Sequence, residues 1–437
     1  MVDNDIIKLA KSCNAQLVNF NSKKTQFETL CHDTRNKTKD AIFIALKGNN
    51  YDGHDYIDEA YRKGAIGAIV GNNYDGKHCN LIKVTDTLEA LQIIGIKNRN
   101  NWKGISIGIT GSAGKTTVKE LCSCILSTKF CTHKSIGNFN NHIGLPLTLI
   151  ELKKHHQFLI SEIGMNKAGE IKTLTNWLQP KISIITEIGL AHSENFKSIK
   201  DIANEKSYLI KNLTKDKTSI LDIDNEWYEY LRNQTKSNII SVSLKNNGQI
   251  NGLYDGYDKL KVDGYNFKLP SPGKFMARNV IKAIALGKLL GLKNNDIRQG
   301  IDSYRPLKYR WNKKVINNIT WINDAYNANP LSMKSSIQAF SIIKSKRKCV
   351  ILGTMHELGS FSYKEHIKLF EFVESFNFDM WITIGNWKDD IFQNLKGKSF
   401  KNIQSALKFL NEWLMPGDHI LLKASRSEKF EEFLIDL

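Results

Sequence analysis

The stretch that decides the fold reads Ile105-Ser-Ile-Gly-Ile-Thr-Gly-Ser-Ala-Gly-Lys-Thr-Thr117. Its apolar first half predicts a buried strand, Gly111 and Gly114 predict a tight loop, and the residues that follow predict a helix. A strand, a glycine loop and a helix in this order attract a phosphate, because bare backbone N–H groups and the helix N-terminus favour an anion. We therefore predict an α/β fold with a phosphate-binding loop.

The side chains of this loop indicate ATP with Mg²⁺ as the ligand. Lys115 would reach the β and γ phosphates, and the Thr116 hydroxyl would ligate the metal. Ile109 stands where the general pattern has its first glycine, which leaves an ordinary glycine turn before a helix as the alternative. The strand, the Gly-Lys-Thr-Thr run and the helix together favour the nucleotide site. The predicted ATP-binding residues are Gly111, Ser112, Ala113, Gly114, Lys115, Thr116 and Thr117.

Two polar residues follow predicted strands farther along the same block. Glu162 ends the apolar strand 157–162, and His192 comes just after the strand 182–187. A metal held against ATP needs oxygen donors, and ligands bind at the carboxyl ends of strands in open α/β sheets. Either residue alone would more often be structural. Because both follow strand ends, we place them at the nucleotide site.

Strands and helices alternate in three blocks, which indicates mostly parallel sheets and a doubly wound α/β architecture. The second block contains the phosphate loop and a strand-rich insert at about 238–270. Predicted strands of the first block are 41–46, 66–70 and 81–84, and those of the third are 321–324, 349–353, 380–384 and 419–423.

Length and composition are those of a multidomain globular protein. At roughly 100–200 residues per domain, two to four domains are expected from 437 residues. The N-terminus lacks the features of a signal peptide, and no apolar run reaches the roughly 18 residues of a membrane span. We expect a soluble cytoplasmic protein. The seven cysteines show no CxxC pair and no histidine at zinc spacing, which predicts reduced thiols.

The net charge of +18 leaves a nucleic-acid-binding protein as an alternative. The lysines, however, are spread along the whole chain and accompany many asparagines. A lysine-rich surface is therefore the favoured explanation, and it would also suit polyanionic small substrates such as nucleotides.

Three segments together resemble the Mur ligase family of amide-bond ligases. Residues 110–117 (TGSAGKTT) look like its ATP loop, and residues 137–148 (GNFNNHIGLPLT) resemble the segment that follows it. Residues 323–332 (NDAYNANPLS) are similar to a signature of the branch that adds D-alanyl-D-alanine. Shorter matches at 33–35, 52–54, 352–359 and 417–423 extend the resemblance over nearly the whole chain.

The resemblance implies a domain division and an activity. The implied domains are a UDP-sugar-binding domain (1–102), a central ATP-binding domain (103–311) and a C-terminal Rossmann-like domain (312–437). The implied enzyme is an ADP-forming ligase of peptidoglycan synthesis that joins D-alanyl-D-alanine to UDP-N-acetylmuramoyl-tripeptide through an acyl phosphate. These two substrates are the expected partners, without nucleic acid, and we expect a monomer.

The resemblance also implies roles for individual residues. Asn279 matches a residue near the adenine, Arg310 one at the terminal phosphate and Asp324 one at the ribose. The implied ligands of two Mg²⁺ ions are Thr116, Glu162, His192 and Lys206, the last as a carbamate, and the implied catalytic residues are Lys115, His192, Lys206 and Arg310. The implied substrate-binding residues are Asp33, Thr34, Arg35, Asn138, Asn141, Tyr326, Asn327 and Asn329.

Some positions depart from the family pattern. Asn323 stands where an acidic residue is frequent, Phe275 where histidine is frequent and Ala424 where glycine is common. These positions concern adenine recognition and domain closure. Two other ligases stay open: one for a single amino acid, which should lack the 326–330 signature, and a folylpolyglutamate-type ligase, which should lack the first block. A nucleic-acid-stimulated ATPase is the alternative from another class.

Overall fold

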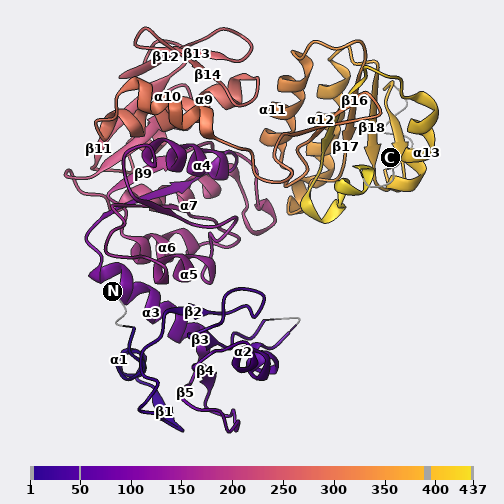
Figure 1. Cartoon of the computed structure of the whole chain (residues 1–437). Coiled ribbons are helices and arrows are strands. Elements are labelled where there is room, and N and C mark those ends of the chain that lie inside the picture. The colour runs from indigo at the N-terminus through magenta and orange to yellow at the C-terminus, as the bar shows by residue number, and fades with distance from the viewer. Residues whose placement is uncertain (1–3, 49–50, 388–394, 435–437) are drawn as a thin grey trace. The chain divides into compact units, whose positions relative to one another are not determined.

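The computed structural model describes residues 4–48, 51–387 and 395–434. Over these residues the strands form three sheets, of five, nine and six strands, with helices between them (Figure 1). Most neighbouring strands run parallel, so the predicted α/β class is confirmed. The chain divides into two compact units. The first comprises residues up to 107, 130–163 and 173–180, and the second comprises 108–129, 164–172 and the chain from 181 onward.

The first unit contains the five-stranded sheet, with the order β1-β5-β4-β3-β2 and only β1 antiparallel to its neighbour. Its side chains alternate between two faces. Ile42 and Ile44 pack against α1 and α3, whereas Phe43 packs against α2, so helices cover both faces. The elements are β1 (Gln16–Val18), β2 (Thr29–Cys31), β3 (Ala41–Ile44), β4 (Gly67–Gly71), β5 (Leu81–Val84), α1 (Ile6–Ser12), α2 (Ile57–Arg62) and α3 (Thr87–Asn101).

The first unit also holds a pair of parallel strands, β7 and β8, and the helix α5, which packs on α3. Their bounds are β7 (Thr132–Lys134), β8 (Phe158–Glu162) and α5 (Gly144–Ile150). The predicted strand 157–162 is therefore confirmed, one residue shorter at its start, and Glu162 is its last residue.

In the second unit, strands β9 to β12 are parallel neighbours in chain order, and β13 and β14 continue the sheet as antiparallel strands. The predicted strand-rich insert thus continues this sheet, because β12 pairs directly with β11. Helix α4 packs against α9 and α10. The elements that lie wholly in this unit are α4 (Lys115–Leu126), β9 (Ile182–Ile185), α7 (Ile199–Lys211), β10 (Thr218–Asp222), α8 (Tyr228–Arg232), β11 (Asn238–Ser243), β12 (Ile250–Tyr254), β13 (Lys259–Val262), β14 (Tyr265–Lys268), α9 (Lys274–Leu289) and α10 (Asn294–Ser303). Strand β6 (Ile105–Thr110), which leads into the loop, and helix α6 (Glu170–Leu178) each have residues in both units.

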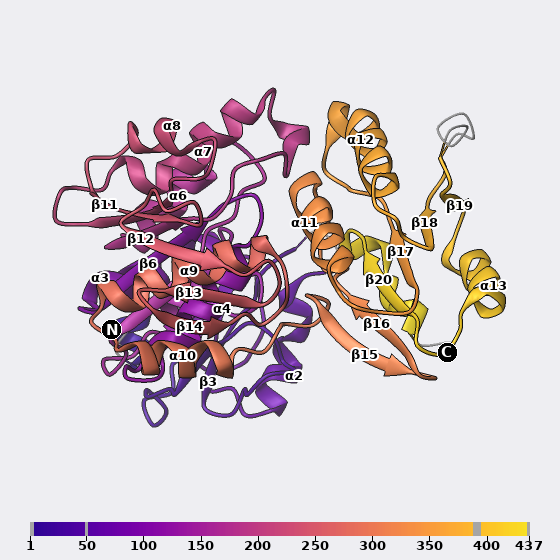
Figure 2. The ribbon, with the colours of Figure 1, turned by 90° about the horizontal axis from the view of Figure 1, so that it is seen from above.

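The six-stranded sheet of the second unit has the order β15-β16-β20-β17-β18-β19, and only β15 and β16 are antiparallel. Figure 2 shows α11 and α12 on one side of this sheet and α13 on the other. Trp321, Ile351 and Ile382 form a core with Leu410 of α13. Helices on both faces give the doubly wound arrangement predicted for this block. The elements are β15 (Asn312–Ile316), β16 (Ile319–Asn323), α11 (Pro330–Ser341), β17 (Lys348–Leu352), α12 (Ser362–Glu374), β18 (Met380–Ile384), β19 (Lys398–Phe400), α13 (Ile403–Trp413) and β20 (His419–Lys423).

Across the described ranges, none of the helices has the length and apolar character that a membrane crossing requires.

Candidate active site

The phosphate loop lies between β6 and α4, as predicted. The backbone has positive φ at Gly111 (150°) and Gly114 (83°), a conformation that favours glycine. Side chains would also clash, because a Cβ on Gly111 would lie 2.0 Å from Thr186 Oγ1 and one on Gly114 would lie 2.6 Å from Asn279 Oδ1. The N-cap residue of α4 is Gly114, which has no side chain to cap the helix. An uncapped helix start after two glycines is the geometry of a phosphate site.

Four predicted residues lie at this loop. Arg310 Nη2 donates to Thr116 Oγ1 at 3.0 Å, and the guanidinium lies 4.0 Å from the centre of the Tyr326 ring. Arg310 Nε is buried and has no hydrogen-bond partner within the described part of the chain. Lys115 Nζ donates to the carbonyl of Gly111 at 2.8 Å. Two cations and a hydroxyl therefore gather at the loop, which suits a polyphosphate ligand.

The signature segment 323–332 contacts the same loop. Asn329 caps α11 by accepting from Ser332 N at 2.9 Å, and its Nδ2 donates to the carbonyl of Ser112 at 3.1 Å. Asn327 is engaged locally, since its Oδ1 accepts from Ala328 N at 2.8 Å. The structure thus brings Asn329 to the ATP loop but not the Asn327 side chain.

Asp324, expected at the ribose, is held by contacts around its own strand. Its carboxylate accepts from Trp311 N at 3.1 Å and from Ser336 Oγ at 2.5 Å, and it lies 2.9 Å from Lys423 Nζ. Burial lowers the pKa of Lys423, and the charge of Asp324 opposes that effect. Asn323, one of the departures from the family pattern, accepts from Ala325 N at 3.0 Å. Three protein groups therefore hold the carboxylate of Asp324 in place.

Asn279, expected near the adenine, is buried with an unused amide. Its side chain is 1% exposed, and neither Oδ1 nor Nδ2 has a hydrogen-bond partner among the described residues. Leaving buried polar atoms unpaired costs about 1–3 kcal/mol, so a ligand edge with both a donor and an acceptor would suit this amide. Its closeness to Gly114 places it at the ATP loop.

Three of the expected metal ligands lie in the second unit: Thr116 at the loop, His192 and Lys206. His192 has a left-handed φ of 54°, and its Nδ1 lies 2.6 Å from Glu357 Oε2. This contact with His192 lowers the pKa of Glu357. Lys206 is buried in α7, beside Glu205, whose carboxylate accepts two backbone N–H groups at 2.9 Å. Glu357 was missed by the sequence analysis, because nothing local in the sequence links it to His192.

Glu162 lies in the first unit, together with the expected residues of segment 137–148. It is 3% exposed and accepts from Asn140 Nδ2 at 2.8 Å. Asn141 Oδ1 accepts from Ile143 N and Gly144 N at the start of α5, and Asn138 is exposed. The sequence analysis passed over Asn140, because nothing in the run of three polar amides distinguishes it.

The residues expected at the uridine nucleotide also lie in the first unit. Arg35 and Asp33 form a bidentate ion pair whose shortest distance is 2.6 Å, and the hydrogen bonds from Arg35 hold the pKa of Asp33 at about 2. Thr34, the residue between them in the sequence, is buried. The ring of His32 lies edge-on to that of Phe139, with 6.3 Å between centres. The 33–35 motif is therefore next to segment 137–148 in the fold.

Three residues of types that can bind a metal ion also lie close together in the first unit. Cys131, His155 and His156 offer ligand atoms within 4.8 Å of one another, although their sequence spacing did not indicate it. His156 Nδ1 already accepts from Lys153 N at 3.1 Å, so that ring nitrogen is occupied. Burial and neighbouring positive groups lower the pKa of His156 to about 4. All seven cysteines are free.

Comparison with known proteins covers nearly the whole chain. Residues 109–287 match the Mur ligase middle domain, and residues 310–426 match the Mur ligase, glutamate ligase domain. A UDP-N-acetylmuramoyl-tripeptide–D-alanyl-D-alanine ligase from a Synechocystis species is 33% identical over 435 residues, which cover 97% of this chain and 94% of that protein. The chain belongs to the Mur ligase family.

Further Mur ligases are similar over their full length. The ligase of the same name from Bacillus subtilis is 30% identical over 453 residues, covering 100% of this chain and 99% of that protein. The crystal structure of MurF from Acinetobacter baumannii matches with a TM-score of 0.90 at 27% identity, covering 99% of this chain and 98% of that one. As a Mur ligase, the chain is an ATP-dependent, ADP-forming ligase, which confirms the predicted family and enzyme class.

Proposed function

We propose that this Mur ligase joins D-alanyl-D-alanine to the free carboxylate of a UDP-N-acetylmuramoyl-tripeptide. The observation that carries the proposal is the position of segment 323–332: Tyr326 stacks on Arg310, and Asn329 donates to the carbonyl of Ser112. This segment resembles the dipeptide-adding branch, and the Synechocystis and Bacillus relatives carry that activity in their names. The signature segment 323–332 and the ATP loop would then act in one site.

The proposed reaction has two steps. The substrate carboxylate attacks the γ-phosphorus of ATP, which breaks the bond to ADP and forms an acyl phosphate. The amine of D-alanyl-D-alanine then attacks the acyl carbon, and the tetrahedral intermediate loses phosphate and a proton to give the amide. Because little covalent work falls to the protein, positioning and charge neutralisation by Lys115 and Arg310 should supply most of the rate.

For the metal, the proposal assigns Thr116, Glu162, His192 and Lys206 as ligands of two Mg²⁺ ions. A hydroxyl and a buried carboxylate suit a hard cation, and Glu357 fixes the ring of His192 as an outer partner of a ligand does. A lysine ammonium offers donors and no lone pair. Lys206 therefore fits only as a carbamate formed with CO₂, which offers anionic oxygens. When bound, Mg²⁺ would neutralise charge on the phosphates.

The proposal also covers the substrate-binding residues, the domain limits, the cellular compartment and the oligomeric state. Asp33, Thr34 and Arg35 would meet the uridine nucleotide, and Asn138, Asn141, Tyr326, Asn327 and Asn329 would meet the peptide substrates, as the resemblance implies. It keeps the domain limits 1–102, 103–311 and 312–437. It also includes a cytoplasmic, monomeric enzyme without a nucleic-acid partner.

The test uses the purified chain with ATP and Mg²⁺. Phosphate release should require both UDP-N-acetylmuramoyl-tripeptide and D-alanyl-D-alanine, and mass spectrometry should show the muramoyl pentapeptide. Faster turnover with a UDP-muramoyl dipeptide and L-lysine or diaminopimelate would assign a single-amino-acid ligase instead. Phosphate release driven by a folate and glutamate, or by polynucleotide alone, would overturn the proposal.

A further inference from the structure

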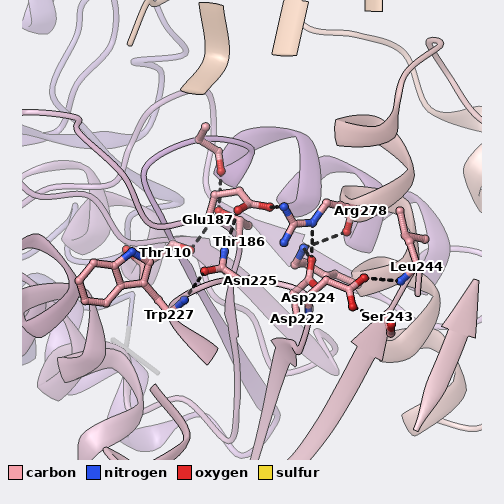
Figure 3. Close-up of polar contacts among 12 residues, drawn as sticks. Thr110, Thr186, Glu187, Asp222, Asp224, Asn225, Trp227, Ser243, Leu244 and Arg278 are labelled. Atoms are coloured by element: carbon pink, nitrogen blue, oxygen red, sulfur yellow. Dashed lines mark hydrogen bonds and ion pairs between the residues drawn. The ribbon is translucent and has the colours of Figure 1, made fainter. Parts of the chain in front are cut away.

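A buried cluster of four charges lies next to the ATP loop (Figure 3). Arg278 Nη1 lies 2.9 Å from Glu187 Oε1, and Arg278 Nε donates to Asp222 Oδ2 at 2.7 Å. Lys282, whose side chain is fully buried, donates to the same Asp222 oxygen at 2.8 Å. Two carboxylates and two cations balance, which makes their burial tolerable.

Stability alone does not explain this cluster. Well-packed apolar side chains of similar volume are often as stabilising as a buried ion-pair network. Burial raises the pKa of Glu187, and the neighbouring Lys282 and Arg278 oppose that rise. Burial also acts to raise the pKa of Asp222, but the same two cations outweigh it and hold that pKa at about 2. The cluster thus keeps Glu187 paired with a cation beside the ATP loop. Burying these charges costs desolvation free energy.

The cluster joins three structural elements. Glu187 follows β9, Asp222 ends β10, and Arg278 and Lys282 lie one turn apart on α9. Asn225, in the loop after β10, adds a fourth contact by donating to Glu187 Oε2 at 2.7 Å. The carboxyl ends of two neighbouring parallel strands are therefore tied to one helix.

The backbone around Glu187 holds the ATP loop on one side. Ser112 N donates to the carbonyl of Glu187 at 2.6 Å, and Thr186 Oγ1 donates to the carbonyl of Ala113 at 2.5 Å. Ser112 Oγ exchanges hydrogen bonds with the backbone of Gly189, at 2.6 and 3.0 Å. Segment 186–189 is thus hydrogen-bonded to loop residues 112 and 113.

Helix α9 approaches the loop from another side. Asn279, the residue after Arg278, comes so close to Gly114 that a Cβ there would lie 2.6 Å from its Oδ1. The side chain of Glu187 is therefore a direct link between segment 186–189, which holds the loop backbone, and the helix that carries Asn279.

We propose that Glu187 is a positioning residue for ATP: its ion pair with Arg278 fixes the spacing between the ATP loop and the unused amide of Asn279. Glu187 contacts no reacting atom in this scheme. Loss of the ion pair would leave the loop and α9 free to shift against each other, so the nucleotide would lose simultaneous contact with both. The inference rests on the proposed ATP site of the loop.

The experiment compares Glu187→Gln with Asp224→Asn. Asp224 belongs to the same network in Figure 3, but its carboxylate accepts from Ser243 Oγ and Leu244 N. Both changes remove one negative charge at nearly constant shape. Because removing one partner of a buried ion pair leaves the other charge uncompensated, Glu187→Gln should raise the KM for ATP and the Kd for ATP about 10- to 100-fold. The kcat and the KM values of the other two substrates should stay within about threefold of wild type. Asp224→Asn should leave all of these constants, including the KM and Kd for ATP, within about threefold of wild type.

Arg278→Lys is the second variant, because lysine keeps the charge but cannot bridge both carboxylates with a planar fork. It should show the same ATP-selective loss. Equal effects of Glu187→Gln and Asp224→Asn would assign the loss to net charge and overturn the proposal. Folded Glu187→Gln and Arg278→Lys variants with an unchanged KM and Kd for ATP would also overturn it. Failure of these two variants to fold would overturn it as well, since the cluster would then serve stability only. The Kd for ATP is measured by calorimetry, which needs no peptide substrate. It therefore tests the role of Glu187 even if the wild-type protein turns over none of the proposed peptide substrates. That second result would overturn the proposed function and not the role of Glu187.

Discussion

Replacing Arg310 with alanine should separate catalysis from stability. Arg310 contacts Thr116 at 3.0 Å and stacks on Tyr326 at 4.0 Å. Losing one preorganised donor to the developing phosphoryl charge costs about 3–4 kcal/mol, or two to three orders of magnitude in kcat. The lost stacking would cost about 0.5–2 kcal/mol of folding free energy. Removing the unpaired, buried Arg310 Nε offsets that loss, so the net change in the free energy of unfolding should stay below about 1 kcal/mol.

The assay is phosphate release at saturating substrates, with urea unfolding of the same preparations. Arg426→Ala is the matched control, because Arg426 also stacks on a tyrosine, Tyr309, at 4.6 Å, and pairs with Glu431. Its turnover should stay within about twofold of wild type, since such exposed substitutions change little. If Arg310→Ala kept turnover within about threefold, or lost activity only by unfolding, a role for Arg310 at the phosphoryl group would be refuted.

Three further variants test separate parts of the molecule. Lys115→Ala should lower kcat by about two to three orders of magnitude with folding intact; a loss of stability alone would make the loop a structural turn. Lys206→Ala should abolish turnover, with partial recovery in a high concentration of a short carboxylate, and an unaffected enzyme would contradict the carbamate. Burial acts to raise the pKa of Asp418, but hydrogen bonds from Arg347 at 2.6 and 2.9 Å and from Met415 N keep it below its ordinary value. Such a carboxylate stabilises the fold above its unfolded pKa, near 3.8, and this contribution disappears as pH falls through the lowered folded value. Asp418→Asn should therefore flatten the fall in unfolding free energy between about pH 5 and pH 2, and an equally steep fall in urea titrations would contradict it.

The parts of the site that are local in sequence could be predicted. The strand, the loop with Gly111 and Gly114 and the following helix follow from glycine conformation and apolar patterning within thirteen consecutive residues. Their φ values and close contacts give the physical reason for both glycines. The alternation of strands and helices likewise predicted the mostly parallel sheets, because that pattern leaves few other topologies.

The parts that depend on contacts between distant segments could not be predicted from the residues alone. Arg310 reaches Thr116 across 194 positions of the chain, and only the family resemblance pointed to it. The ion pairs of Glu187 and Asp222 with Arg278 had no local signal, because acidic residues at strand ends and basic residues on helices are usually solvated. Asn140, Glu357 and the cluster around Glu187 were missed for this reason.

Asn329 combines a structural and a functional contact in one side chain, and Asn329→Asp separates them. Aspartate is as good an N-cap as asparagine, so the bond accepted from Ser332 N should survive and the melting temperature should hold. The donor to the carbonyl of Ser112, at 3.1 Å, is lost and replaced by a carboxylate oxygen. An unpaired carbonyl facing a negative charge costs about 1–3 kcal/mol, which predicts a rise of about 10- to 100-fold in the KM for ATP. Asn402→Asp is the matched control, since Asn402 caps α13 by accepting from Ser405 N at 2.9 Å; it should leave the KM for ATP unchanged. If both variants behaved alike, the conformation of the ATP loop would not depend on the signature segment, and Asn329 would not join dipeptide specificity to ATP use.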